Sequence, residues 1–141
     1  MDISFQEIGD EKYHTEVLYG LLKSRVHSIS HITIPTIEEH SNFVRNHPYR
    51  AWFLVKYQDQ FIGSVYLTEQ NTIGININDE LILKILPYVI EKIESEFEPL
   101  PAIKSVRSAN FFINVAPSNT HLIRALESYG CKCSQVSYLL R

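Results

Sequence analysis

Three short segments rich in β-branched and aromatic residues follow one another near the middle of the chain, with only two or three polar residues between them. They cover residues 52–57, 60–68 and 72–78, and the connections are residues 58–59 and 69–71. Connections this short form tight turns between antiparallel strands. We therefore predict a three-stranded antiparallel meander at the centre of the fold.

The segments on either side of the meander show strand and helix patterns in turn. Thr36 is followed three residues later by Glu39, a capping box that predicts the start of a helix. Pro87 either kinks its helix or lies in the first turn. Around the meander, the predicted elements are a strand at 3–8, a helix at 11–26, a helix after Thr36, a helix at 81–97, a strand at 110–115, a helix at 120–128 that Gly130 ends, and a strand at 131–140. This order predicts one mixed α/β domain over residues 1–141.

Length and charge restrict the classes of function. Two cores in 141 residues would have about 70 residues each, near the lower limit for a stable domain, so one domain is expected. Thirteen Lys and Arg against sixteen Asp and Glu give a net charge of −3, which argues against a nucleic-acid partner bound through bulk charge. The longest apolar stretch, residues 81–90, contains Lys84 and Pro87 and is too short to cross a membrane.

The two cysteines, Cys131 and Cys133, indicate the compartment. Their spacing is too close for an unstrained disulfide, and no second pair or nearby His completes a zinc site. We expect reduced thiols in a cytoplasmic protein that holds no metal, because the N-terminus also lacks the pattern of a signal peptide.

In the C-terminal third of the chain, residues 113–119 (INVAPSN) are followed by Leu126 and Gly130. This pattern resembles the fifth strand and the following helix of the GNAT superfamily of acyl-CoA-dependent N-acetyltransferases. Residues 61–67 and 73–77 are similar to its third and fourth strands. The resemblance implies an α/β (α+β) domain with a central mixed, mostly antiparallel sheet, helices on both faces, and a splayed pair of fourth and fifth strands.

The same resemblance implies acetyl-CoA, or another acyl-CoA, as co-substrate, with no metal. In this family the pantetheine arm inserts at the splayed strands like an additional strand. That assigns its backbone contacts here to Ile75, Asn76 and Ile77, and it places Val115 and Asn119 on the facing side. Asn119 also suits the role of a helix N-cap, and it can fill both roles.

The N-terminal half of the chain contains the residues that indicate the class of acceptor and the candidate general bases. Ser30-His31, Glu39-His40 and residues 47–52 (HPYRAW) are similar to a branch of the family that acylates amino groups of sugars. This implies a small-molecule amine acceptor, with an amino sugar as the favoured class, and it allows a homodimer. The candidate bases are His31 and His47, which would wall the acceptor site, and Glu69, at a strand turn; each also suits a structural or solvated role.

Two positions depart from the family pattern. The family holds the CoA pyrophosphate on a Gly-rich loop before the helix that follows its fourth strand, but this chain has Asp79 and Glu80 there and no Gly or Arg. Their negative charges predict weak binding of CoA. The family's tyrosine acid falls on Leu126, with Tyr129 further along. The alternative function is therefore a non-catalytic binding or partner module with the same fold.

Overall fold

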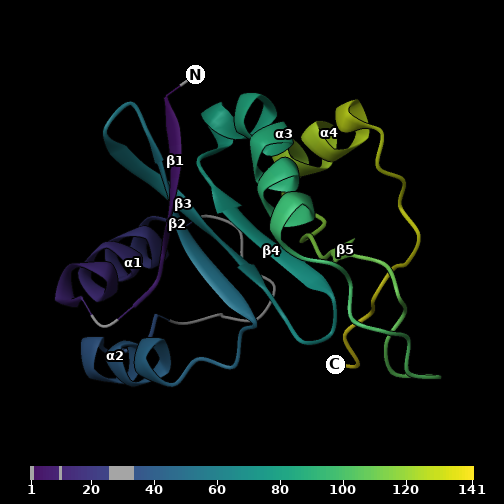
Figure 1. The fold of residues 1–141 in the computed structure, drawn as a ribbon, viewed down its shortest axis with the longest axis horizontal. Helices are drawn as coiled ribbons and strands as arrows, with labels where there is room; N and C mark the ends of the chain where they lie inside the picture. The colour runs from purple at the N-terminus through teal and green to yellow at the C-terminus, as the bar shows by residue number, and fades with distance from the viewer. Residues whose placement is uncertain (1, 10, 26–33) are drawn as a thin grey trace.

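A five-stranded sheet lies at the centre of the computed structural model, which describes residues 2–9, 11–25 and 34–141 (Figure 1). Its strands, in sheet order, are β1 (Ile3–Glu7), β2 (Ala51–Tyr57), β3 (Gln60–Leu67), β4 (Thr72–Ile77) and β5 (Phe112–Ile113). Neighbouring strands are antiparallel except for β4 and β5, which are parallel. The sheet is mixed and mostly antiparallel, as predicted, and β2, β3 and β4 form the predicted meander.

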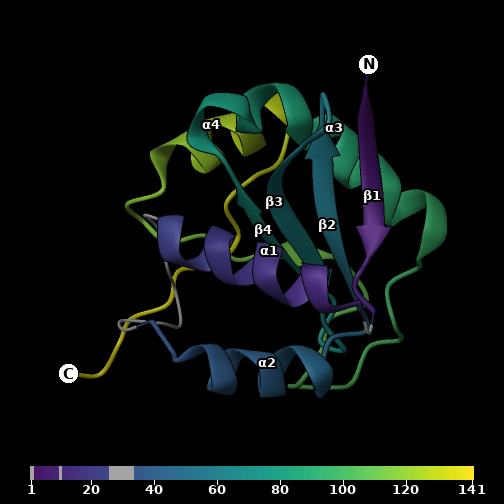
Figure 2. The ribbon, with the colours of Figure 1, turned by 90° about the vertical axis from the view of Figure 1, so that its left-hand side faces the viewer.

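In the described part of the chain, two helices cover each face of the sheet (Figures 1 and 2). Helices α1 (Lys12–Ser24) and α2 (Ile37–Arg45) lie on one face, and α3 (Asp79–Glu96) and α4 (Thr120–Tyr129) lie on the other. The prediction of helices on both faces is confirmed. None of these helices is both long enough and apolar enough to cross a membrane.

Strand β2 is apolar on both sides because helices cover both faces. Successive side chains of a strand point to opposite faces. Trp52 and Leu54 pack with residues of α1 and α2, whereas Phe53 and Val55 pack in the larger cluster with residues of α3 and α4. All residues from Ala51 to Val55 are buried. The continuous apolar run in the sequence therefore reflects a strand between two helical layers.

The local helix signals of the sequence are present in the structure. The Thr36 side chain accepts a hydrogen bond from the Glu39 N–H (3.2 Å), and the Glu39 carboxylate accepts one from the Thr36 N–H (2.9 Å), so the predicted capping box is confirmed. Gly130 follows α4 with φ of 109°, the left-handed conformation that glycine adopts without strain. Pro87 lies inside α3 and not in its first turn.

A fully buried asparagine anchors the turn between β3 and β4. The Asn71 side-chain amide donates to the carbonyls of Leu100 (2.9 Å) and Ser108 (2.8 Å), and its carbonyl oxygen accepts from the Leu100 N–H (2.7 Å). The Asn71 backbone carbonyl also accepts from the Phe112 N–H (2.9 Å). These bonds hold the long segment between α3 and β5 against the end of the sheet, and so they fix where β5 begins.

The C-terminal segment differs from the prediction. Residues 131–141 form no strand, and the predicted strand at 110–115 is reduced to Phe112–Ile113. Tyr138, Leu139 and Leu140 are 92%, 95% and 88% exposed. A strand requires a neighbouring edge for its backbone hydrogen bonds, and a two-residue β5 offers too little edge for a final strand. The prediction of a strand at 131–140 is therefore wrong.

Candidate active site

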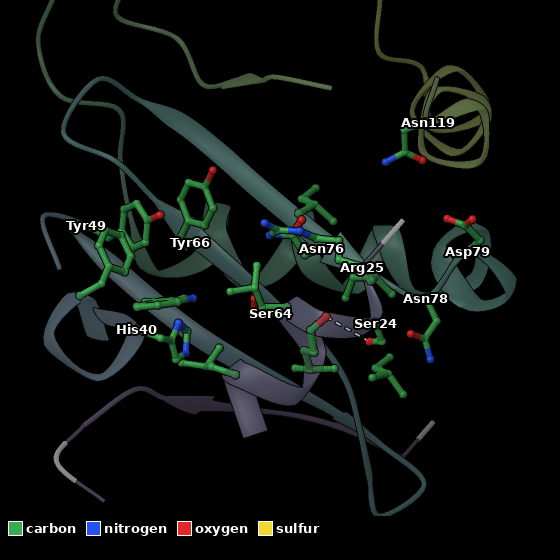
Figure 3. A pocket seen from close by; sticks show the side chains of 18 of the residues that line it. Ser24, Arg25, His40, Tyr49, Ser64, Tyr66, Asn76, Asn78, Asp79 and Asn119 are labelled. Atoms are coloured by element: carbon green, nitrogen blue, oxygen red, sulfur yellow. Dashed lines mark hydrogen bonds between the residues drawn. The ribbon is translucent and has the colours of Figure 1, made fainter. Parts of the chain in front are cut away.

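The pairing between β4 and β5 ends after two residues of each strand. Thr72 pairs with Phe112 and Ile73 with Ile113, and beyond this point β4 continues to Ile77 without β5 at its side. A pocket of about 560 Å³ opens here, lined by the free part of β4, by residues of α1 and α2, by the first residues of α3 and by the N-cap of α4 (Figure 3). The predicted splay of the fourth and fifth strands is confirmed, and the pocket beside it is the candidate active site.

Aromatic side chains form one wall of the pocket. Tyr66 lies across β4 because residue 74 is glycine: a Cβ there would come within 2.0 Å of the Tyr66 ring. The rings of Tyr66 and Tyr49 are stacked, with centroids 4.1 Å apart, and Tyr49 also meets Trp52 edge-on. Burial, followed by the neighbouring Tyr66, raises the pKa of Tyr49 to about 12, so its phenol is neutral near pH 7. The wall is therefore a neutral, preformed surface against which a flat or apolar group can pack.

Arg25 brings a positive charge into this pocket. It follows the last residue of α1, is half-buried, and reaches into the pocket over the middle of β4 (Figure 3). Burial lowers the pKa of the guanidinium, and the nearby phenols of Tyr66 and Tyr49 act in the opposite direction. Among the residues that the structure describes, no carboxylate forms an ion pair with Arg25 and no acceptor takes a hydrogen bond from its side chain.

The first turns of α3 and α4 meet at the other end of the pocket. Asn119 is the N-cap of α4, and its side-chain oxygen accepts from the Leu122 N–H (3.2 Å). Asp79 lies in the first turn of α3, with a carboxylate oxygen 3.5 Å from Nδ1 of His121, and Glu80 follows it. Asn119, Asp79 and Glu80 all line the pocket. This end therefore combines an amide with carboxylates at a helix N-terminus.

Four of the predicted cofactor-binding residues lie together. Ile75, Asn76, Ile77 and Asn119 line the pocket, on two elements that face each other. Val115 does not line it; this residue is half-buried and packs against the main core cluster. The structure thus gathers most of the predicted binding segment, and the binding of acyl-CoA by these residues stays a prediction.

The predicted catalytic residues are more scattered. His47 does not line the pocket; its Nδ1 accepts from the Tyr49 N–H (3.2 Å), its ring meets Tyr49 and Trp52, and burial lowers its pKa. Glu69 is exposed on the turn between β3 and β4, outside the pocket lining. His31 lies outside the described residues. The catalytic roles of these residues stay predictions.

Two polar residues of the pocket were not among the site residues predicted from the sequence. His40 is buried on α2, one turn before Val44, and lines the pocket with its ring 5.3 Å from that of Tyr19. Arg25 continues the apolar stripe of Leu18, Leu21 and Leu22. In both cases the available signal was a polar residue at a core-facing position of an amphipathic helix.

Within the described residues, no group of three or more His, Cys, Asp or Glu side chains is placed to hold a metal ion.

Comparison with known proteins places the fold. No protein-family model and no curated protein matches the chain. A solved domain from Methanocaldococcus jannaschii aligns over 96% of this chain and 92% of that one, with a TM-score of 0.69 and 14% identity. A possible acetyltransferase from Clostridium difficile 630 aligns over 100% and 98%, with a TM-score of 0.57 and 14% identity.

The complex of the aminoglycoside N-acetyltransferase AAC(6')-Iy with the bisubstrate analogue CoA-S-monomethyl-acetylneamine also has this architecture. It aligns over 100% of this chain and 98% of that one, with a TM-score of 0.61 and 13% identity. The chain therefore has the fold of the GNAT acetyltransferases, as the sequence resemblance implied. At these low sequence identities the structural similarity establishes the fold alone. Any inference about function has to come from the residues of the site.

Proposed function

We propose that this chain transfers an acyl group from acyl-CoA to the amine of a small acceptor. The observation that carries the proposal is the pocket beside the part of β4 that β5 leaves free. The amide groups of an extended pantetheine arm can bond to a strand edge as an added strand does, and Ile75, Asn76 and Ile77 line the pocket at that edge. Because backbone groups make such bonds, they do not depend on particular side chains.

The reaction replaces a thioester by an amide. The neutral amine attacks the thioester carbonyl, a backbone N–H of the β4 edge stabilises the oxyanion, the thiolate leaves and takes a proton, and the amine gives up a proton to a base. His40 is the imidazole that lines the pocket in the described part of the chain. We therefore propose His40 as the base, ahead of His47 and Glu69, which lie outside the lining.

Asn119 supports binding from the facing helix. Its side-chain oxygen caps α4 through the Leu122 N–H, and its NH₂ group lines the pocket and can donate to a pantetheine carbonyl. A cap and a ligand contact use different atoms of the same amide. The amino-sugar acceptor that the sequence favoured stays one open class of acceptor within this proposal, and the acceptor panel described below tests it against an anionic one. The predictions of a cytoplasmic location, a homodimer and one domain over residues 1–141 are kept as part of this proposal.

A second candidate function is a binding or partner module that no longer catalyses. Asp79 and Glu80 favour it, because they place carboxylates where the fold would hold the CoA pyrophosphate. Leu126 favours it as well: at 8% exposure it is part of the core and supplies no acid for the leaving thiolate.

Release of free thiol from acetyl-CoA, followed with a set of amines, separates the two functions. The proposal predicts amine-dependent release and predicts that Asn119→Ser, which keeps the helix cap, lowers it with little change in stability. Asn119→Ala is the matched variant, and it should also lose about 0.5–2 kcal/mol of stability. No release with any amine, although acetyl-CoA is bound, would favour the binding module.

A further inference from the structure

We infer that the acceptor carries an anionic group beside its amine, namely a carboxylate on an apolar or aromatic body, and that Arg25 binds this carboxylate. The inference rests on the proposed function and names the class of its acceptor. Its starting point is the half-buried guanidinium of Arg25, which has no carboxylate partner among the described residues. Charges inside proteins are normally paired, so an unpaired one in a pocket indicates a missing anion.

The described acidic residues that line the pocket lie in the first turns of α2 and α3 and form no ion pair with Arg25. Glu39 completes the capping box of α2 through the Thr36 N–H (2.9 Å). Asp79 lies 3.5 Å from His121, and Glu80 follows it in the first turn of α3. The stretch from 26 to 33, VHSISHIT, contains no Asp or Glu. The chain segments that border Arg25 therefore offer it no carboxylate of their own.

The position of Arg25 distinguishes acceptor from cofactor. Arg25 lines the same pocket as Tyr66 and Tyr49, which belong to the aromatic wall (Figure 3). The end where a GNAT fold would hold diphosphate is the first turn of α3, and it carries Asp79 and Glu80. The positive charge thus lies over the middle of β4, where the acyl carbon and the amine must meet, and the negative charges lie where the cofactor phosphates would be.

The surroundings of Arg25 decide what kind of anion fits. Leu18, Leu21, Leu22 and Phe43 line the pocket on the helical side, and the stacked Tyr49 and Tyr66 line it on the strand side. Trp52 adds an indole N–H that is buried and donates to no acceptor among the described residues. A planar carboxylate pairs with guanidinium through two parallel hydrogen bonds. An amino acid with an apolar or aromatic side chain therefore matches the wall, the charge and the geometry together.

The test compares matched acceptors in the transfer assay with the full chain. The panel is phenylalanine, phenylalanine amide, glucosamine, glucosamine 6-phosphate and neamine. We expect phenylalanine to exceed its amide in kcat/KM by about 10- to 100-fold, which is the effect of one charge-assisted contact. Arg25→Met, which keeps the packing of the side-chain stem, should remove this preference, so that the ratio of kcat/KM for phenylalanine to kcat/KM for its amide falls to about one. Arg25→Lys should retain part of it.

Each other outcome overturns the inference in a distinct way. Equal kcat/KM values for phenylalanine and its amide in the wild type would contradict a carboxylate contact. An equal loss of kcat/KM for both acceptors in Arg25→Met would contradict it as well. A preference for glucosamine 6-phosphate that Arg25→Met abolishes assigns the charge to a phosphate instead. A higher KM for acetyl-CoA in Arg25→Met, with the preference for acid intact, assigns it to the cofactor. Preference for neamine excludes an anionic acceptor.

Calorimetry with the product analogue N-acetylphenylalanine separates this inference from the proposed function. If no amine is acylated but the wild type binds N-acetylphenylalanine at least about tenfold more tightly than Arg25→Met does, the transferase proposal fails and the carboxylate site stands. If acylation occurs and neither protein discriminates between N-acetylphenylalanine and its amide, the transferase proposal stands and the carboxylate site is overturned.

Discussion

Gly74 shapes the wall of the candidate site although it has no side chain. It sits in the middle of β4, opposite Tyr66 in the register of β3 and β4, and its missing Cβ is what lets the Tyr66 ring lie down on the sheet. The stack of Tyr66 on Tyr49 then brings both rings against the space that Arg25 enters. The absence of a side chain at Gly74 therefore permits the stack of Tyr66 on Tyr49.

Gly74→Ala should displace the Tyr66 ring, because the new Cβ would lie 2.0 Å from a ring carbon. We expect weaker acceptor binding and a loss of about 1–3 kcal/mol of stability from overpacking. Gly20→Ala in α1 is the matched control, because a Cβ there meets nothing within 4 Å, and it should stabilise the protein by about 0.5–1 kcal/mol. Equal effects of the two substitutions on thermal unfolding and acceptor binding would contradict this account of the wall.

His47 should contribute to the pH dependence of stability. Burial lowers its pKa from the usual 6.5, so the folded state favours the neutral imidazole. The stabilisation is present above pH 6.5, where the unfolded chain is also neutral, and it is lost as the pH falls through the folded pKa. Chemical unfolding at pH 7 and pH 5 should show a smaller loss of stability for His47→Gln than for the wild type. A loss of the same size in both proteins would exclude burial of a neutral His47.

At the scale of elements, the sequence predicted those whose signals are local. The capping box at Thr36 and Glu39, the short turns of the meander and Gly130 after α4 each depend on a few adjacent residues, and each is present. The prediction of a strand at 131–140 failed because a strand also needs a neighbouring strand with which to pair. The neighbouring strand β5 has only two residues, and its length depends on contacts between segments distant in the sequence. The pocket residues also divide into those that local sequence signals predicted and those that depend on the packing of distant elements. Ile75 to Ile77 lie on a predicted strand, whereas His40 and Arg25 become site residues only when α1 and α2 pack beside β4.

Asn71 joins two elements, and its loss should be costly. Asn71→Gly keeps the left-handed backbone conformation (φ of 65°) but removes the hydrogen bonds to Leu100 and Ser108, and it should lower the free energy of unfolding by about 2–4 kcal/mol. Asn71→Ala should cost about 1 kcal/mol more, because alanine is strained in that conformation. Denaturant unfolding measures both. A loss below about 0.5 kcal/mol in Asn71→Gly would show that this side chain does not hold the segment before β5.

At the scale of the whole molecule, charge is distributed unevenly along the pocket. Arg25 lies over the middle of β4, and Asp79 and Glu80 lie at the first turn of α3. Two like charges 4–5 Å apart repel by about 3–4 kcal/mol at an effective dielectric constant near 20. A diphosphate at that end therefore meets repulsion, while an anionic acceptor in the middle meets attraction. If the proposed function holds, this distribution of charge predicts weak cofactor binding beside an acceptor site that favours anions.

Replacing Asp79 and Glu80 by Asn and Gln together should tighten the binding of CoA by about 10- to 100-fold, because the repulsion is partly screened by solvent and salt. Pantetheine, which carries no phosphate, should bind both proteins equally and serves as the control ligand. Calorimetry with each ligand measures the difference. Unchanged or weaker binding of CoA to the double variant would show that its phosphates lie elsewhere.

Amide hydrogen exchange with and without saturating acetyl-CoA tests the central claim, the binding of an acyl-CoA along the free edge of β4, most directly. The claim predicts slower exchange at the amides of Ile75 and Ile77, whose N–H groups point to the free edge because Asn76 is hydrogen-bonded to β3. It also predicts protection at the first turn of α4 beside Asn119, because these groups would contact the pantetheine arm. The outer strand β1, on the far side of the sheet, should be unaffected. Saturated acetyl-CoA binding with no change at Ile75 and Ile77, or no binding at all, would contradict the account.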